Sequence, residues 1–191
     1  MVGPPLNHDP VTMTISDKSA VRIRLRAVRR MVGGGAIRVS SAYLDRLRGA
    51  PCVASYIPVG GEADPGPLEH AASAAGCPIA LPHVTDRETP LRFLEWRRGT
   101  ALVTGPFGLL QPPESAPEAL PAVILTPLVG FDRNGARLGQ GAGHYDRAFA
   151  AHPDAWRIGI AFACQEVDSL PTDPWDIPLQ AIATDIDWIE P

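Results

Sequence analysis

Glycine residues crowd one stretch of this chain, residues 130–147, and their arrangement suits the binding of a phosphate group. The stretch follows an apolar run, residues 122–125, and leads into residues 145–151, which can be helical. Glycines let the backbone approach an anion closely, and a helix N-terminus directs free N–H groups and a positive dipole end towards it. The order of strand, glycine-rich turn and helix start therefore indicates a phosphate-binding loop.

Charged side chains bracket these glycines. Arg137 and Arg147 carry forked guanidinium donors that match the oxygens of a phosphate. Asp146 can hold a magnesium ion beside the phosphates. No lysine of the Walker type follows the glycines, so the stretch is not the common P-loop.

A second basic region lies in residues 18–31, which are predicted to form a helix capped by residues 16–17. Val21, Leu25 and Val28 form its apolar stripe, at spacings of four and three. The basic side chains around this stripe have two interpretations. They can form a solvated face, or the helix can lie against the phosphates of a nucleotide.

The nucleotide interpretation depends on Lys18 and Arg22. The two residues are four apart, so they share one helical face and can reach the same anion. A similar pair of alternatives applies to Glu62 and Asp64, which follow the first predicted strand. Ligand sites in open α/β sheets collect at the carboxyl ends of strands, but carboxylates in loops are usually solvated.

The composition is that of a folded protein without a general affinity for polyanions. The 191 residues suit one domain, and 45% hydrophobic with 20% charged residues is usual for a globular chain. The net charge of −4 argues against a binder of nucleic acid or of membrane surfaces. No apolar run approaches the roughly 20 residues that span a bilayer. We expect a monomer.

The cysteines and the N-terminus indicate the cellular compartment in which the protein is expected. Cys52, Cys77 and Cys164 lie far apart and form no Cys-x-x-Cys pair, which favours reduced thiols in the cytoplasm. Residues 1–16 have neither a basic start nor an apolar middle, so they do not form a signal peptide. We expect them to be a mobile tail, followed by a single domain over residues 17–191.

Predicted strands and helices alternate along the chain. The strands are residues 51–56, 78–82, 91–96, 122–125, 156–162, 181–184 and 186–189, and the helices are residues 18–31, 39–47, 67–75 and 145–151. This alternation predicts a three-layer, doubly wound α/β domain with a mostly parallel sheet. We expect residues 122–125, the most apolar strand, at its centre and residues 91–96 near its edge. Tyr43, Leu44 and Leu47 are predicted to face inward.

The glycine-rich stretch resembles the signature of the 5-formyltetrahydrofolate cyclo-ligase family, whose members are also called 5,10-methenyltetrahydrofolate synthetases. The matching residues are Phe131, Asp132, Gly135, Arg137, Leu138, Gly139, Gly141, Gly143, Tyr145, Asp146 and Arg147. Four further places agree in the same order, namely Lys18 with Arg22, residues 56–58 with Glu62 and Asp64, residues 105–109, and residues 175–179. The resemblance extends from about residue 17 to the C-terminus.

The resemblance implies a doubly wound α/β fold and a reaction that needs ATP and Mg²⁺. In this reaction 5-formyltetrahydrofolate closes to 5,10-methenyltetrahydrofolate. The formyl oxygen is phosphorylated, N10 attacks the activated carbon, and phosphate leaves. ATP and a reduced folate are thus the implied ligands.

The resemblance also implies roles for individual residues. The ATP-binding set is Lys18, Arg22, Arg137, Gly139, Gln140, Gly141, Ala142, Gly143, His144 and Tyr145. The folate-binding set is Tyr56, Glu62, Phe107 and Tyr145, the metal ligands are Asp146 and Asp176, and the catalytic set is Arg137, Tyr145 and Arg147. These residue types suit the chemistry, because phosphoryl transfer needs charge neutralisation and positioning, and a carboxylate can accept paired hydrogen bonds from a pterin.

Three positions depart from the family pattern. His144 stands where an aromatic residue is usual, Gln111 replaces a glutamate before Pro112, and Trp175 replaces a small polar residue or histidine. These departures leave two other hypotheses open. One is a nucleotide- or folate-binding paralogue without ring closure, and the other is a different phosphate-ester or acyl-transfer enzyme on the same scaffold.

Overall fold

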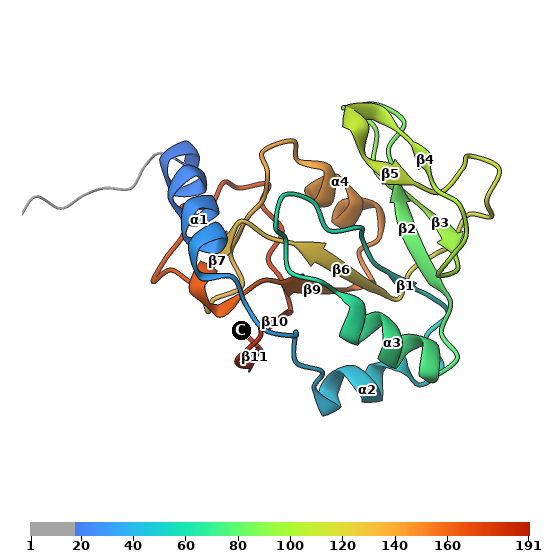
Figure 1. Ribbon diagram of the computed structural model, residues 1–191, viewed down its shortest axis with the longest axis horizontal. Coiled ribbons are helices and arrows are strands. Elements are labelled where there is room, and N and C mark those ends of the chain that lie inside the picture. Colours follow the sequence, from blue (N-terminus) through green and yellow to red (C-terminus); the bar gives the residue numbers. More distant parts are fainter. Residues whose placement is uncertain (1–17) are drawn as a thin grey trace, which may run out of the picture.

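The computed structural model describes residues 18–191, so the predicted tail of residues 1–16 and the predicted cap at residues 16–17 lie outside the described residues. A seven-stranded sheet in the order β11-β10-β9-β6-β1-β2-β3 forms the centre of the domain (Figure 1). Its strands are β1 Val53–Ala54, β2 Ile79–His83, β3 Arg92–Trp96, β6 Val123–Pro127, β9 Trp156–Ile160, β10 Ala181–Ala183 and β11 Trp188–Ile189.

Five neighbouring strands of this sheet are parallel. β1 pairs with β2 on one side and β6 on the other, β6 pairs with β9, and β9 pairs with β10. The two edge strands, β3 and β11, are antiparallel to their neighbours. This confirms the predicted mostly parallel sheet, with its most apolar strand, β6, at the centre. The strand order reverses between β1 and β6, where a doubly wound sheet opens a crevice.

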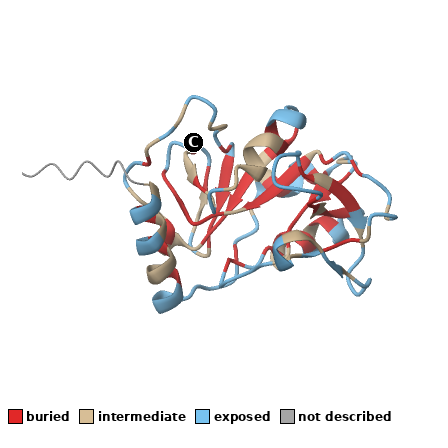
Figure 2. Ribbon diagram, turned by 90° about the horizontal axis from the view of Figure 1, so that it is seen from above, coloured by how far each residue is buried: buried red, intermediate tan, exposed pale blue. Residues whose placement is uncertain are grey.

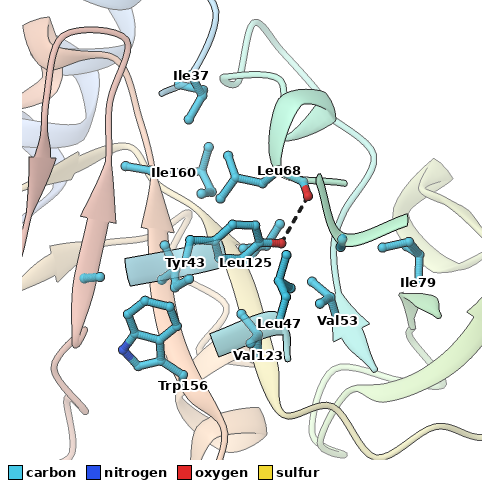
Figure 3. Packing of buried hydrophobic residues seen from close by; sticks show 14 of the residues in the cluster. Ile37, Tyr43, Leu47, Val53, Leu68, Ile79, Val123, Leu125, Trp156 and Ile160 are labelled. Carbon is cyan, nitrogen blue, oxygen red and sulfur yellow. Dashed lines mark hydrogen bonds between the residues drawn. The ribbon is translucent and has the colours of Figure 1, made fainter. Parts of the chain in front are cut away.

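Helices cover both faces of the sheet, as the three-layer prediction requires. The helices are α2 Ser41–Leu47 and α3 Gly66–Ala74 on one face, and α4 His144–Ala151 on the other. Along β6, Val123 and Leu125 pack in the same cluster as Tyr43 (Figure 3). Ile124 instead packs in the cluster that contains Phe149 of α4. The strands are largely buried, and the outer sides of the helices are exposed (Figure 2).

Helix α2 differs from its prediction at its start and in one inward residue. It begins at Ser41, because Ser40 caps it with a side-chain oxygen that accepts a hydrogen bond from the Tyr43 amide at 3.1 Å. This start sets Tyr43 and Leu47 towards the core, where the Tyr43 hydroxyl donates to the Leu68 carbonyl at 3.1 Å. Leu44 is 48% exposed, so its predicted inward position is wrong.

Helix α1, Lys18–Val32, packs beyond the end of the sheet on a small hairpin formed by β7 Gly130–Phe131 and β8 Arg137–Leu138. Its predicted residues Val21 and Leu25 are buried against Leu138. A Cβ on Gly130 would lie 2.3 Å from the Leu25 side chain, so this glycine permits the close approach of helix and hairpin.

A second hairpin, β4 Val103–Thr104 and β5 Leu110–Gln111, carries the short 3₁₀ helix η1 Pro106–Gly108 at its tip. In Figure 1 α1 and this hairpin stand at opposite ends of the molecule, with α4 between them. A further 3₁₀ turn, η2 Ala163–Gln165, follows β9.

The predicted thiols are confirmed, because Cys52, Cys77 and Cys164 are all free. Within residues 18–191, no helix combines the length and apolar character needed to cross a membrane.

Candidate active site

A cavity of about 530 Å³ opens at the carboxyl ends of β1, β2 and β6. Helix α1, the glycine loop at residues 139–143, the turn after β1 and the β4–β5 hairpin enclose it. Apart from Arg147 and Asp64, it gathers the site residues predicted from the sequence, namely Lys18, Arg22, Tyr56, Glu62, Phe107, Arg137, Gly139, Gln140, Gly141, Ala142, Gly143, His144, Tyr145, Asp146 and Asp176. Residues from five separate segments of the chain thus meet in one site.

The glycine loop connects β8 to α4. Gly141 and Gly143 have positive φ angles of 106° and 68°, a region that side chains rarely adopt, and Gly143 is the N-cap residue of α4. The β7–β8 hairpin lies between the central strand and this loop, so β8, rather than β6, is the strand that leads directly into it. The predicted order of strand, glycine turn and helix start is therefore found, with β8 as the strand in place of β6.

Helix α1 holds the glycine loop through two arginines. The Arg22 Nε donates to the Gly139 carbonyl at 2.8 Å, and the Arg26 guanidinium donates to the Gln140 side-chain oxygen. Arg24, on the other side of the helix, and Arg30, near its C-terminal end, are exposed. Part of the basic helix is thus solvated, and Arg22 and Arg26 contact the glycine loop.

Arg137 is the most enclosed cation of the cavity, with a side chain that is 6% exposed. Its guanidinium donates to the Ile177 carbonyl and to the Asp146 carboxylate, and its central carbon lies 4.6 Å from the centre of the Phe149 ring. Burial lowers the pKa of Arg137, and attraction to Asp146 and Asp176 opposes that shift. Two acceptors at its edges and a ring against its face hold this guanidinium in one orientation.

Lys18 lies at the start of α1 and contacts two carboxylates of the loop before β10. Its Nζ is 2.6 Å from Asp173 Oδ2 and 2.8 Å from Asp176 Oδ2. Partial burial lowers the pKa of Lys18, but the hydrogen bonds with both aspartates outweigh it, so the net shift is upward. Burial similarly raises the pKa of Asp176, and the hydrogen bond from Lys18 helps to bring it below its ordinary value.

Glu62 is buried in the turn after β1. Its Oε2 accepts a hydrogen bond from the Val59 amide at 3.1 Å, and its Oε1 accepts one from the Gln140 side chain at 3.0 Å. The Tyr56 hydroxyl donates to the Ala63 carbonyl at 2.5 Å, which fixes the turn next to Glu62. Asp64 is exposed and accepts from the Gly66 amide at 2.9 Å, so only Glu62 of the two predicted carboxylates lines the cavity.

Tyr145, in the first turn of α4, lines the cavity and interacts electrostatically with Glu62 and Arg137. Burial raises its pKa strongly, the negative charge of Glu62 adds to the shift, and the positive charge of Arg137 opposes it. The phenol therefore stays protonated at neutral pH and can donate a hydrogen bond.

Arg147 does not line the cavity. Its guanidinium donates to the Arg87 carbonyl at 2.6 Å and to the Ala142 carbonyl at 3.1 Å, so it supports the glycine loop from behind. The same group lies 3.1 Å from His144 Nδ1. Burial lowers the pKa of His144, and the positive charges of Arg147 and Arg87 lower it further, which keeps the imidazole neutral at pH 7. The His144 ring faces that of Phe107, at 6.4 Å between centres.

The other two departures from the family pattern occupy different environments. Gln111 is buried, and its side-chain oxygen accepts a hydrogen bond from the Val84 amide at 3.0 Å, which ties the β4–β5 hairpin to the end of β2. Trp175 is 69% exposed at the rim of the cavity.

Several residues at the site were not predicted from the sequence, and three polar ones are informative. Asp173 and Thr126 line the cavity, and Arg26 contacts its glycine loop. The spacing of three between Asp173 and Asp176 in an acidic loop was a usable signal for Asp173. A single threonine in an apolar strand carries no comparable signal, so Thr126 could be found only from the fold.

Comparison with known proteins agrees with this geometry. The model of the 5-formyltetrahydrofolate cyclo-ligase family matches residues 14–185. The 5-formyltetrahydrofolate cyclo-ligase of Mycolicibacterium smegmatis is 33% identical over 189 residues, which cover 90% of this chain and 95% of that protein. The Escherichia coli K12 cyclo-ligase is 36% identical over 142 residues, which cover 71% and 78% of the two chains.

A solved structure is also similar. The NMR structure of 5,10-methenyltetrahydrofolate synthetase from Aquifex aeolicus superimposes with a TM-score of 0.68 at 25% identity, over 91% of this chain and 92% of that chain. This agreement confirms the α/β fold. With the match of the family model over most of the sequence, it leads to one assignment: the chain belongs to the 5-formyltetrahydrofolate cyclo-ligase family.

Proposed function

We propose that this protein converts 5-formyltetrahydrofolate to 5,10-methenyltetrahydrofolate and, by transfer of the γ-phosphoryl group to the formyl oxygen, converts ATP to ADP and phosphate in the same reaction. The observation that carries the proposal is a single cavity lined by Glu62, Arg137 and Tyr145, in which Tyr145 interacts electrostatically with both of the others. Glu62 suits a ligand with N–H groups, and Arg137 suits one with phosphates. The relatives that match most of the chain have names that state the same reaction.

Three cations and a backbone loop serve the nucleotide in this proposal. Lys18, Arg22 and Arg137 enter the cavity from α1 and β8, and residues 139–143 supply N–H donors at the start of α4. Phosphoryl transfer depends on charge neutralisation and on an in-line arrangement more than on a covalent nucleophile. The side chains of this half therefore bind and orient the triphosphate.

Magnesium fits the carboxylates of the cavity. Asp146 and Asp176 both line it, and Arg137 interacts electrostatically with both. Among residues 18–191 no three His, Cys, Asp or Glu side chains gather as a metal site of their own. That suits Mg²⁺, which commonly takes one or two protein carboxylates together with phosphate oxygens. Asp146 and Asp176 would hold the ion, and the ion would supply neutralisation of phosphate charge.

The folate half of the cavity is built from the turn after β1 and the β4–β5 hairpin. We assign Glu62 to the polar edge of the pterin and Phe107 to an aromatic face of the substrate. The formyl oxygen attacks the γ-phosphorus and ADP leaves. N10 then attacks the formyl carbon and loses its proton, while the carbon–oxygen bond breaks and phosphate departs. Tyr145, as a neutral phenol between the two halves, donates a hydrogen bond to the reacting groups.

A direct assay tests the proposal. Purified protein with 5-formyltetrahydrofolate, ATP and Mg²⁺ should produce the near-ultraviolet absorbance of methenyltetrahydrofolate and one ADP per product. Reactions that lack either ATP or the folate should produce none. Binding of both ligands by calorimetry without any absorbance change would overturn the proposal in favour of a binding protein of the same fold.

A further inference from the structure

Thr126, near the end of the central strand β6, has a hydroxyl without a partner. The residue is 1% exposed and lines the cavity, yet within residues 18–191 its Oγ1 makes no hydrogen bond. Leaving a buried hydroxyl unpaired costs free energy, so proteins usually satisfy such groups. A buried polar atom at a cavity wall therefore points to a partner that arrives with a ligand.

Thr126 lies at the place in the sheet where ligands of doubly wound α/β proteins usually bind. β6 and β1 flank the place where the strand order reverses, and their carboxyl ends meet there. The register of these two strands pairs Ala54 with Ile124, so its continuation sets Thr126 level with Tyr56. Side chains alternate along a strand, which places Thr126 on the same face as Ile124 and hence on the side of α4 and Tyr145.

The surroundings of Thr126 favour the folate over the nucleotide. Apart from Arg87 in the loop after β2, the side-chain cations of the site come from α1 and β8, and the backbone N–H donors come from residues 139–143. Thr126 instead lies beside the strand that leads to Glu62, with Pro127 as its neighbour on the cavity wall. A hydroxyl can both donate and accept, which suits the mixed donors and acceptors of a reduced pterin.

We propose that the Thr126 hydroxyl is a specificity-determining contact that hydrogen-bonds the ring system of the reduced folate. This inference rests on the proposed function, because that function supplies the folate. It adds to Glu62 a second polar anchor from a different strand, on the floor of the cavity.

The test replaces Thr126 by valine, which keeps the branched shape and removes only the hydroxyl. Calorimetry with 5-formyltetrahydrofolate should show an affinity about tenfold weaker than wild type, the effect of losing one hydrogen bond. Affinity for ATP with Mg²⁺ should change less than about twofold. The thermal midpoint of the unliganded variant should equal or exceed that of wild type, because an unpaired buried hydroxyl is removed. Thr126→Ser should retain the folate affinity.

Thr184 provides a matched control. It is also fully buried, but its Oγ1 donates to Asp187, with Oδ1 of that residue at 2.7 Å. Thr184→Val should therefore lower the thermal midpoint and leave folate affinity unchanged, the opposite of the Thr126 result.

Several outcomes would overturn the inference. Wild-type folate affinity in Thr126→Val would show that the hydroxyl contacts no folate, and a weakened affinity for ATP alone would transfer it to the nucleotide. A wild-type protein that binds no folate would refute the proposed function itself. A wild-type protein that binds folate without turnover would refute only the reaction, since the affinities of the variants still decide the role of Thr126.

Discussion

Two groups of cations and carboxylates flank the part of the cavity that we propose binds the nucleotide, and they are built differently. The Arg137 group comprises Arg137, Asp146 and the Phe149 ring, and its guanidinium is 6% exposed. The Lys18 group comprises Lys18, Asp173 and Asp176, whose side chains are 24%, 43% and 23% exposed. The first group joins a hairpin strand to the helix that follows it, while the second joins residues more than 150 positions apart.

The difference indicates two kinds of phosphate contact. Arg137 is held by a carbonyl, a carboxylate and a ring, so its charge is oriented before any ligand arrives. Preorganised charge is the most effective kind for stabilising a transition state. Lys18 is a flexible chain held only by ion pairs in a partly solvated place, and such pairs contribute little to stability. We infer that Lys18 can transfer from the aspartates to a phosphate, which frees Asp176 for Mg²⁺.

The largest expected effect comes from Arg137→Ala. We predict a fall of roughly 10²-fold or more in kcat/KM for ATP, the scale of losing a contact to developing charge. Arg133→Ala is the matched control, because Arg133 lies on the same β7–β8 hairpin turn but binds Glu166 and Asp187 outside the cavity. The control should stay within about twofold of wild type. An unchanged kcat/KM in Arg137→Ala would show that this arginine only supports the fold.

Most of the residues predicted for the site line one cavity, and they could be predicted because each lies in a short local motif. Three such motifs can be recognised in the sequence alone. They are the glycines of residues 139–143, the spacing of Lys18 and Arg22, and the turn that carries Glu62. The central place of β6 was also predictable, since a strand buried on both faces must be apolar throughout. Long-range polar contacts were not predictable. The hydrogen bond between Gln140 and Glu62 connects the glycine loop to the turn after β1, and the sequence around neither residue predicts it.

Local ambiguity explains the remaining differences. Residues 131–135 form a tight turn because Asp132 Oδ1 accepts hydrogen bonds from the Asn134 and Ala136 amides, so a hairpin stands where the sequence indicated one continuous loop. Leu44 shows the same limit in a helix. Which residues of a seven-residue helix face the core depends on where the helix begins. The role of Ser40 as the N-cap residue becomes visible only in the structure.

The Lys18 group should give an intermediate effect. We predict that Lys18→Met, which keeps the apolar stem and removes the charge, raises KM for ATP roughly 10- to 50-fold, as for the loss of a charge-assisted hydrogen bond. The free energy of unfolding should change by less than about 1 kcal/mol, because the ion pairs are partly solvated. Steady-state kinetics with chemical denaturation measures both quantities. A large loss of stability with an unchanged KM would make Lys18 a structural residue and remove the proposed transfer.

The smallest effect should appear in the magnesium requirement of Asp146→Asn. Asparagine keeps an oxygen that can accept from Arg137, so the guanidinium stays in place while one charge is lost for the metal. We predict that the Mg²⁺ concentration for half-maximal activity rises about fivefold, equivalent to about 1 kcal/mol of binding free energy. Asp173→Asn is the matched control, since the Asp173 side chain is 43% exposed and contacts Lys18, which Asp176 still holds. Its magnesium titration should match that of wild type. A shift in Asp173→Asn with none in Asp146→Asn would make Asp173, rather than Asp146, the partner of Asp176 at the metal.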